Sequence, residues 1–329
     1  MSAMPAQPIK AAIVGLGRWG KTLVDSVQGK SERIRFTHAV SRDPTQHRDF
    51  LEQRQLLGDT RFADILADPT IDAVVLATPH TQHVAAVVAA AAAGKAVFCE
   101  KPLALSRDGA ARAVGACRDA GVVLGIGTDK RHFPAIAEVA RLADNGELGP
   151  LLHVEGHFSN EVAAGFAAWR DSFEETPAGG MTGTGIHVLD ALTRIAGPVR
   201  RIHAQLLSRK PPPDPRDSLA ILLDFASGIG GTLAAVRSTP TFLRVHAFGR
   251  EGSAEAIGRN EIVVRKSGVE PVRRKFPPAD TVQINLEAFA DAVAGTAPYP
   301  IPPEIILNVT NAFIAISDAI RTGVAAQEV

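Results

Sequence analysis

Residues 10–20 read Lys-Ala-Ala-Ile-Val-Gly-Leu-Gly-Arg-Trp-Gly, and this stretch decides the fold of the first part of the chain. Its apolar beginning predicts a short β-strand, and a helical pattern follows the last glycine. A strand, a Gly-x-Gly-x-x-Gly turn and a helix in this order are typical of dinucleotide-binding sites. We expect Gly15 to allow the tight bend, Gly17 to let a pyrophosphate approach the backbone, and Gly20 to let helix and strand pack closely. The amide groups at the helix start would then hold the phosphates.

Length and composition limit the class of protein. A chain of 329 residues suits two domains, and 46% hydrophobic residues suit a well-packed globular protein. Lys plus Arg number 35, as do Asp plus Glu, so the charge supports neither a nucleic-acid nor a membrane-surface partner. Cys99 and Cys117 are too few for a disulfide framework or a zinc site, so we expect no metal and free thiols. With no signal-peptide pattern in residues 1–8, a cytoplasmic protein is expected.

Strand and helix patterns alternate through about residue 128. The predicted strands after the first cover 34–40, 72–77, 96–99 and 122–126, and the predicted helices include 62–67, 84–93 and 107–120. The continuous apolar run 72–77 is typical of a strand buried on both faces. The alternation predicts an α/β fold with a doubly wound parallel sheet, the N-terminal Rossmann domain, over residues 1–128.

Strands and helices no longer alternate regularly in residues 129–329. Helical patterns cover 134–145, 186–196, 282–294 and 304–322, while strand patterns cover 151–159, 201–209, 218–225, 231–238, 243–249 and 261–266. Successive strands without intervening helices predict a large, mostly antiparallel open sheet with helices on one face. We therefore expect a C-terminal α+β domain over residues 129–329.

The end of the second predicted strand bears on the choice of coenzyme. In the NAD fingerprint an acidic residue grips the ribose 2′-hydroxyl at this point, but Ser41 stands there and Arg42 follows. A hydroxyl and a guanidinium can bind a 2′-phosphate, which favours NADP(H). NAD(H) stays possible, with Arg42 solvated and Asp43 on the ribose.

Several motifs stand together beyond the glycine turn. They are Ala77-Thr78-Pro79, His83, Ala92-Ala93-Gly94-Lys95, Glu100-Lys101-Pro102, Trp169-Arg170 and Gly185-Ile186-His187-Val188-Leu189-Asp190. In this order they closely resemble the glucose–fructose oxidoreductase / inositol dehydrogenase (Gfo/Idh/MocA) family over nearly the whole chain. The resemblance implies an NAD(P)-dependent oxidoreductase that moves a hydride between nicotinamide and a hydroxyl or carbonyl carbon of a sugar, cyclitol or related small molecule. It also implies that the C-terminal domain, residues 129–329, binds the substrate and forms a homodimer or homotetramer through its sheet.

The resemblance assigns site residues. Lys101 would lie beside the reacting carbon and His187 would be the general acid/base, so these two are the catalytic candidates, and with Thr184 they are the substrate-binding candidates. The coenzyme-binding candidates are Gly15, Gly17, Arg18, Trp19, Gly20, Ser41, Arg42, Ala77, Thr78, Pro79, His80, His83, Glu100, Lys101, Trp169 and Arg170. The chemistry suits these residue types, since imidazole can accept the hydroxyl proton and an ammonium can stabilise charge on the oxygen.

One departure from the family pattern affects the prediction. Family members with a Lys-Asp-His set have an aspartate four residues before the histidine, where this chain has Gly183. Asp190, one turn after His187, could compensate or could be a structural hydrogen-bond acceptor. The structural alternatives are that Lys101 is a surface lysine and that His187 is a core histidine.

Two other functions stay open: a glycosidase that retains its nucleotide and uses transient oxidation, and a non-catalytic sensor of nucleotide and sugar.

Overall fold

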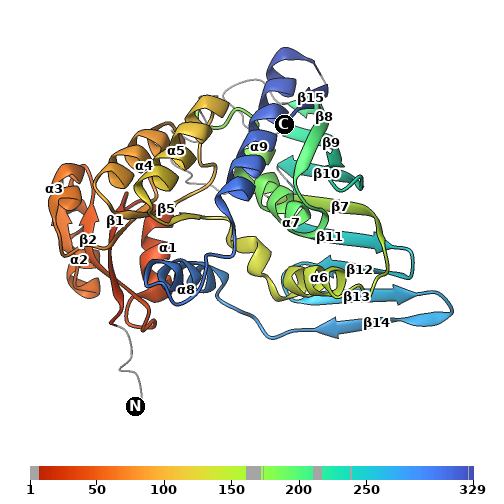
Figure 1. Ribbon diagram of the computed structural model, residues 1–329, viewed down its shortest axis with the longest axis horizontal. Coiled ribbons are helices and arrows are strands. Elements are labelled where there is room, and N and C mark those ends of the chain that lie inside the picture. The colour runs from red at the N-terminus through yellow and green to blue at the C-terminus, as the bar shows by residue number, and fades with distance from the viewer. Residues whose placement is uncertain (1–6, 161–171, 173, 210–216, 238, 325) are drawn as a thin grey trace. The chain divides into compact units, whose positions relative to one another are not determined.

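The computed structural model describes residues 7–160, 172, 174–209, 217–237, 239–324 and 326–329 (Figure 1). By contacts between residues the chain divides into two compact units. The first unit comprises Met1–Gly127 and Asp280–Ile306, and the second comprises Thr128–Ala279 and Leu307–Val329.

The first unit contains a parallel sheet of six strands in the order β3-β2-β1-β4-β5-β6. The strands are β1 (Ile9–Val14), β2 (Ile34–Val40), β3 (Leu57–Asp59), β4 (Ala73–Leu76), β5 (Ala96–Cys99) and β6 (Leu124–Ile126). All residues of β4 and β5 are buried, as the continuous apolar run 72–77 predicted for β4. The doubly wound parallel sheet expected from the sequence is therefore confirmed, with its strand order reversing between β1 and β4.

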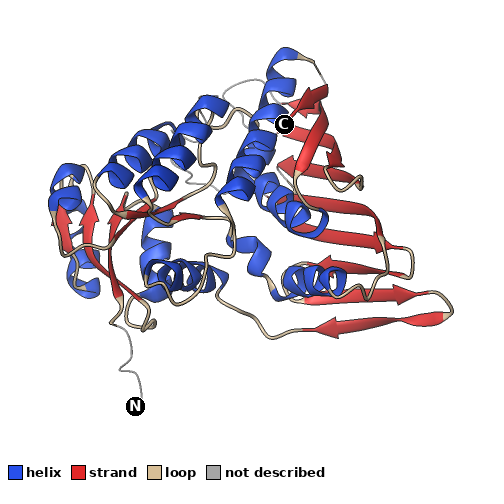
Figure 2. Ribbon diagram, in the orientation of Figure 1, coloured by secondary structure: helices blue, strands red, loops and turns tan. Residues whose placement is uncertain are grey.

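Helices pack in pairs on this sheet (Figure 2). Helix α1 (Arg18–Val27) packs against α8 (Thr281–Val293), and α4 (His83–Ala92) packs against α5 (Arg107–Ala120). Two shorter helices, α2 (Arg48–Arg54) and α3 (Phe62–Ala67), complete the unit. Helix α5 begins and ends as expected, because the Ser106 side chain accepts a hydrogen bond from the Gly109 N–H and Gly121 adopts a left-handed conformation.

Residues 280–306 pack with the first unit, although the sequence analysis counted them with the second domain. The apolar side of α8 is buried in the same core as β1 and α1, and the Phe289 ring lies 5.6 Å from the Phe98 ring. Polar contacts reinforce this packing: Asn285 Nδ2 donates to the Ile126 carbonyl at 2.9 Å, and the Tyr299 hydroxyl accepts from the Ile126 N–H at 3.2 Å. The chain therefore crosses back to complete the first core after it has formed the second sheet.

The second unit is built on a nine-stranded sheet in the order β14-β13-β12-β11-β7-β10-β9-β8-β15. Its strands are β7 (Leu151–Asn160), β8 (Val199–Arg209), β9 (Asp217–Phe225), β10 (Gly230–Arg237), β11 (Phe242–Gly249), β12 (Gly252–Ile257), β13 (Glu261–Lys266), β14 (Val269–Lys275) and β15 (Ala326–Glu328). Neighbours run antiparallel except β7 and β10, which pair in parallel. The mostly antiparallel open sheet is confirmed, and β12, β14 and β15 are strands that the sequence analysis did not predict.

One face of this sheet is covered by helices. Helix α7 (Ile186–Ala196) packs on β7, and α6 (Pro134–Asp144) packs on β11 to β13 (Figure 1). The last helix of the chain is α9 (Pro303–Thr322). On β9 the residues Leu219, Ile221 and Leu223 are buried while Leu222 is 57% exposed. By length and composition α9 could cross a membrane, yet over half of its apolar window is buried inside the protein, as in a core helix.

Candidate functional site

The turn between β1 and α1 has the geometry of a nucleotide cradle. Gly15 has φ +101°, and a Cβ there would stand 2.7 Å from the Ala77 carbonyl oxygen, so a side chain is excluded. A Cβ on Gly20 would stand 1.9 Å from the Gly15 carbonyl oxygen, which shows how closely helix and strand pack. A Cβ on Gly17 would meet no atom of the described chain within 4 Å. The residues present therefore fit a bound pyrophosphate, since of the three glycines the one with open space is the one expected to face it.

Two further candidates lie on the first turn of α1. Arg18 is exposed, and Trp19 is half-buried against the core that β1 and α8 share. The helix begins after Gly17, and within the described residues no side chain caps its start. A helix start of this kind is a favourable place for an anion.

A buried histidine connects the loops after β4 and β5. The His83 ring places Nδ1 2.8 Å from the Pro102 carbonyl oxygen and Nε2 3.1 Å from the Thr78 carbonyl oxygen. His80 is also buried, with its ring edge-on to His83 at 5.6 Å, and Ala77, Thr78 and Pro79 are half-buried. The histidine thereby fixes the two loops that carry predicted coenzyme-binding residues.

The Glu100-Lys101 pair follows β5. Glu100 is buried, and its Oε2 accepts a hydrogen bond from the Lys101 N–H at 3.3 Å. Its carboxylate lies over Gly127 so closely that a Cβ there would stand 2.3 Å from Oε1. The side chain of Lys101 is half-buried at the carboxyl end of the parallel sheet, where ligands bind in open α/β folds.

The end of β2 carries the residues expected to select the coenzyme. The Ser41 hydroxyl accepts from the Asp43 N–H at 3.2 Å, and the Arg42 side chain is exposed. Both carboxylate oxygens of Asp43 are used locally, because Oδ1 accepts from Thr45 and Oδ2 accepts from Gln46 Nε2 at 2.9 Å. These hydrogen bonds, first that from the Thr45 side chain, lower the pKa of Asp43.

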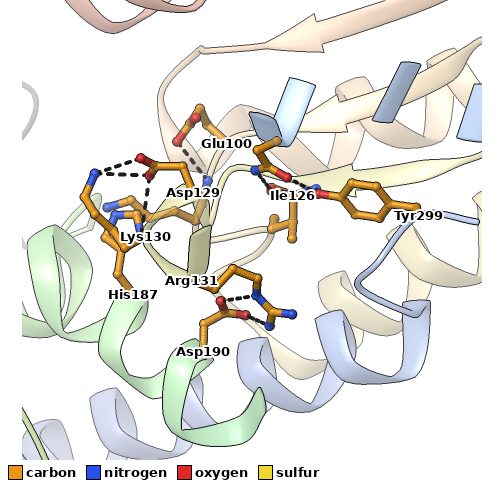
Figure 3. Close-up of polar contacts among 10 residues, drawn as sticks. Glu100, Ile126, Asp129, Lys130, Arg131, His187, Asp190 and Tyr299 are labelled. Atoms are coloured by element: carbon orange, nitrogen blue, oxygen red, sulfur yellow. Dashed lines mark hydrogen bonds and ion pairs between the residues drawn. The ribbon is translucent and has the colours of Figure 1, made fainter. Parts of the chain in front are cut away.

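In the second unit His187 stands on the first turn of α7 and is buried. Its Nδ1 lies 3.9 Å from Oδ1 of Asp129, whose carboxylate is also bound by Lys130 Nζ at 3.0 Å (Figure 3). Asp129 and Lys130 belong to the short helical turn η3 (Asp129–His132). The sequence analysis did not find Asp129, because no motif joins it to the distant segment that carries His187.

The two other residues near His187 in the sequence are committed to local contacts. Thr184, in the π-helical turn η5 (Met181–Gly185), donates its hydroxyl proton to the Gly180 carbonyl at 3.0 Å. Both carboxylate oxygens of Asp190 accept hydrogen bonds from Arg131, at 2.5 and 2.7 Å. The substrate-binding role of Thr184 stays a prediction, and in this structure its hydroxyl proton is donated within the chain.

Two of the predicted coenzyme-binding residues, Trp169 and Arg170, lie outside the described residues. Within the described part of the chain, no group of three or more His, Cys, Asp or Glu side chains is arranged to hold a metal ion.

A glycine-rich βα turn in a six-stranded doubly wound sheet, followed by a large open sheet, defines a dinucleotide-dependent α/β protein. Residues 9–128 match the family model described as "Oxidoreductase family, NAD-binding Rossmann fold", and residues 136–255 match the GFO/IDH/MocA C-terminal domain. These matches span more than half of the chain, and the chain belongs to the GFO/IDH/MocA oxidoreductase family. It is an NAD(P)-dependent oxidoreductase.

Individual relatives illustrate the range of the family. The chain is 29% identical to a scyllo-inositol 2-dehydrogenase (NAD(+)) of Bacillus subtilis over 263 residues, 74% of this chain and 72% of the relative. It is 28% identical to a D-xylose 1-dehydrogenase (NADP(+)) of Haloferax volcanii, over 81% of this chain and 83% of the relative. The structure of the aldose-aldose oxidoreductase of Caulobacter crescentus superposes with a TM-score of 0.87 at 23% identity, covering 98% of this chain and 100% of that one, which shows the shared fold.

Proposed function

We propose that this protein is an NADP(H)-dependent dehydrogenase or reductase that acts on a CH–OH carbon of a sugar, cyclitol or related polyol. The observation that carries the proposal is the open space at Gly17 between two sterically obligatory glycines, in a chain of this family. The named relatives act on a cyclitol and an aldose, which supports the substrate class.

The preference for NADP(H) rests on the end of β2. A 2′-phosphate needs a cation and hydrogen-bond donors, which the exposed Arg42 guanidinium and the Ser41 hydroxyl can supply. The competing interpretation needs the Asp43 carboxylate for the ribose of NAD(H), but that carboxylate already accepts hydrogen bonds from Thr45 and Gln46. The names of the relatives include both coenzymes, so we infer the preference from these side chains alone.

The bound coenzyme would supply the hydride acceptor or donor at its nicotinamide. The turn at Gly15, Gly17 and Gly20 would hold its phosphates, and the loop of Thr78 and Pro79 would line its path. The proposed roles of Lys101 in the first unit and His187 in the second follow from the chemistry of their side chains.

In our proposal His187 exchanges a proton with the substrate hydroxyl, and the Lys101 ammonium stabilises the negative charge that develops on substrate oxygen. His187 is buried, so its ring is shielded from bulk water. Lys101 is half-buried, so its ammonium group is only partly hydrated and can donate hydrogen bonds to a ligand. Deleting either side chain should reduce turnover, and deletion of the His187 side chain should leave coenzyme binding at the glycine turn intact.

We further propose that a second copy of this chain covers the open face of the nine-stranded sheet. That face has a hollow of about 480 Å³, lined in part by Leu222, Phe242 and His157, with the Arg244–Glu155 ion pair beside it. Leu222 and Phe242 are 57% and 46% exposed, and exposed apolar side chains on an open sheet face suit burial in an isologous dimer. Light scattering of wild type and Leu222→Glu tests this: a smaller assembly is expected for the variant.

A cytoplasmic location is proposed from the two thiols. Cys99 and Cys117 are free and buried, and burial raises the pKa of Cys117 to about 11. Unpaired cysteines persist in a reducing compartment, which supports this location.

The test of the proposed function is a titration of the purified protein with NADPH and with NADH, followed by turnover assays on cyclitols and aldoses. We expect NADPH to bind more tightly, and Arg42→Ala to remove most of that preference. Arg35→Ala is the matched control, because Arg35 is an exposed arginine at the other end of β2. Equal affinities in wild type would overturn the NADP(H) preference, and binding without turnover of any substrate would favour a sensor.

A further inference from the structure

The position at which the family carries its aspartate has no side chain in this chain, so no carboxylate reaches His187 from it. Gly183 stands there, and a Cβ on Gly183 would lie 3.5 Å from Nη1 of Arg237. The same Arg237 nitrogen donates a hydrogen bond to the Gly179 carbonyl at 3.0 Å. The charged group beside position 183 is therefore the cationic Arg237 guanidinium, and a carboxylate partner for His187 has to come from another element.

Asp190 does not replace the missing aspartate as a carboxylate partner of His187. Its two oxygens receive the Nε and Nη2 hydrogen bonds of Arg131, and both side chains are almost completely buried. This bidentate pair fixes η3 against α7, and α7 packs closely on η3. The pair thereby holds the neighbouring residue of η3, Asp129, in place.

Asp129 supplies a carboxylate to His187 from a different element. The two side chains are 5% and 6% exposed, and 3.9 Å separates Oδ1 of Asp129 from Nδ1 of His187 (Figure 3). This separation is too long for a hydrogen bond but short for a pair of charges in a place with little water. The carboxylate also has a resident counter-ion in the Lys130 ammonium, 3.0 Å away.

We propose that Asp129 is the positioning residue of the acid/base His187 and replaces the aspartate missing at position 183. This inference rests on the proposed role of His187. Because Nδ1 faces Asp129, the substrate proton is exchanged at Nε2. The oxidised coenzyme would accept the hydride of the carbinol carbon, so that oxidation of the carbinol to a carbonyl leaves the hydroxyl proton for the protein to accept. The hydroxyl proton passes to Nε2 of His187, and the Asp129 carboxylate stabilises the imidazolium until that proton leaves to solvent.

The direct test is Asp129→Asn, which keeps the size of the side chain and removes its charge. We expect kcat to fall by about tenfold to a hundredfold, the size typical of a lost acid/base contribution, with the Kd of NADPH unchanged. Asp129→Glu keeps the charge and should retain most of the turnover. Unchanged kcat in Asp129→Asn, or equal losses in the asparagine and glutamate variants, would overturn the proposal.

A double-mutant cycle shows whether Asp129 acts through His187. If it does, Asp129→Asn has little further effect on the residual turnover of His187→Ala, because the group it serves is gone. Additive losses would overturn the proposal. Asp129→Asn in a Lys130→Met background is the control for charge balance, and the same fold-loss is expected there as in wild type. A loss that disappears with Lys130→Met would show that Asp129 serves only the lysine.

The outcomes for the two proposals are separable. If His187→Ala keeps wild-type turnover, the proposed function of His187 fails. If His187→Ala is inactive but Asp129→Asn is fully active, only the role of Asp129 fails.

Discussion

Arg131 and Asp190 form a buried bidentate pair, with Nε and Nη2 of the arginine 2.7 and 2.5 Å from the two carboxylate oxygens. The pair joins η3 to α7 inside the second unit, where the side chains are 6% and 2% exposed. Its position explains why the Asp190 of the sequence motif is a structural residue, since both of its oxygens are occupied. Loss of either partner should therefore destabilise the second unit.

Asp190→Asn should destabilise the fold, because it leaves a buried guanidinium without its counter-charge. We expect a loss of about 3–5 kcal/mol in the free energy of unfolding, measured by urea denaturation. The matched control is Asp144→Asn, which removes the partner of Arg194 in an ion pair whose side chains are 42–46% exposed. There the change should stay below about 1 kcal/mol. Equal effects of the two substitutions would contradict the buried pair's importance.

Two glycines of the first turn should behave in opposite ways. Gly20→Ala should destabilise the protein severely, since its Cβ would stand 1.9 Å from the Gly15 carbonyl oxygen. The methyl group of Gly17→Ala meets no described atom within 4 Å, so the free energy of unfolding should change by no more than about 1 kcal/mol. Its affinity for NADPH should nevertheless fall at least about tenfold, as the new methyl group would occupy pyrophosphate space. Thermal unfolding and fluorescence titration measure the two effects, and wild-type affinity in Gly17→Ala would refute the cradle.

His246, on β11, should make stability depend on pH. Burial lowers the pKa of His246 to about 4, and its ring lies against Phe248 at 3.8 Å. The unfolded chain takes up a proton near pH 6.5 while the folded ring stays neutral, so stability is lost as pH falls from about 6.5 to about 4. At pH 5 the loss should be about 2 kcal/mol relative to pH 7.

His246→Gln removes this titration, so the difference in unfolding free energy between pH 7 and pH 5 should shrink by about 2 kcal/mol. His153→Gln serves as the control, because the His153 side chain on β7 is 37% exposed. If the pH dependence of the His246 variant equals that of wild type, the buried neutral histidine is excluded.

Much of the first unit is encoded in local patterns of the sequence. The strands β1, β4 and β5 are short apolar runs, and the glycine turn marks where α1 begins, so periodicity and turn chemistry were sufficient. Strand β14 was missed because all seven of its residues are exposed and the sequence Val-Glu-Pro-Val-Arg-Arg-Lys shows no buried face. Such an edge strand is defined by pairing with β13, which periodicity cannot show.

The remaining differences come from contacts between distant segments. The return of α8 to the first core depends on the packing of Phe289 against Phe98 and on the bonds of Asn285 and Tyr299 to Ile126. No local feature encodes these partners. Asp129 could not be found from the sequence for the same reason, because its relation to a histidine on α7 exists only after η3 and α7 have packed.

Hydride transfer is measured most directly by following deuterium from substrate to coenzyme. The protein is incubated with NADP⁺ and a panel of cyclitols and aldoses deuterated at their carbinol carbons, and the nicotinamide is analysed by NMR. We predict deuterium on a single face of nicotinamide C4 for at least one polyol, with the transfer lost in His187→Ala and in Lys101→Ala. Tight binding of NADPH with no deuterium transferred from any member of the panel, or undiminished transfer in both variants, would contradict this function.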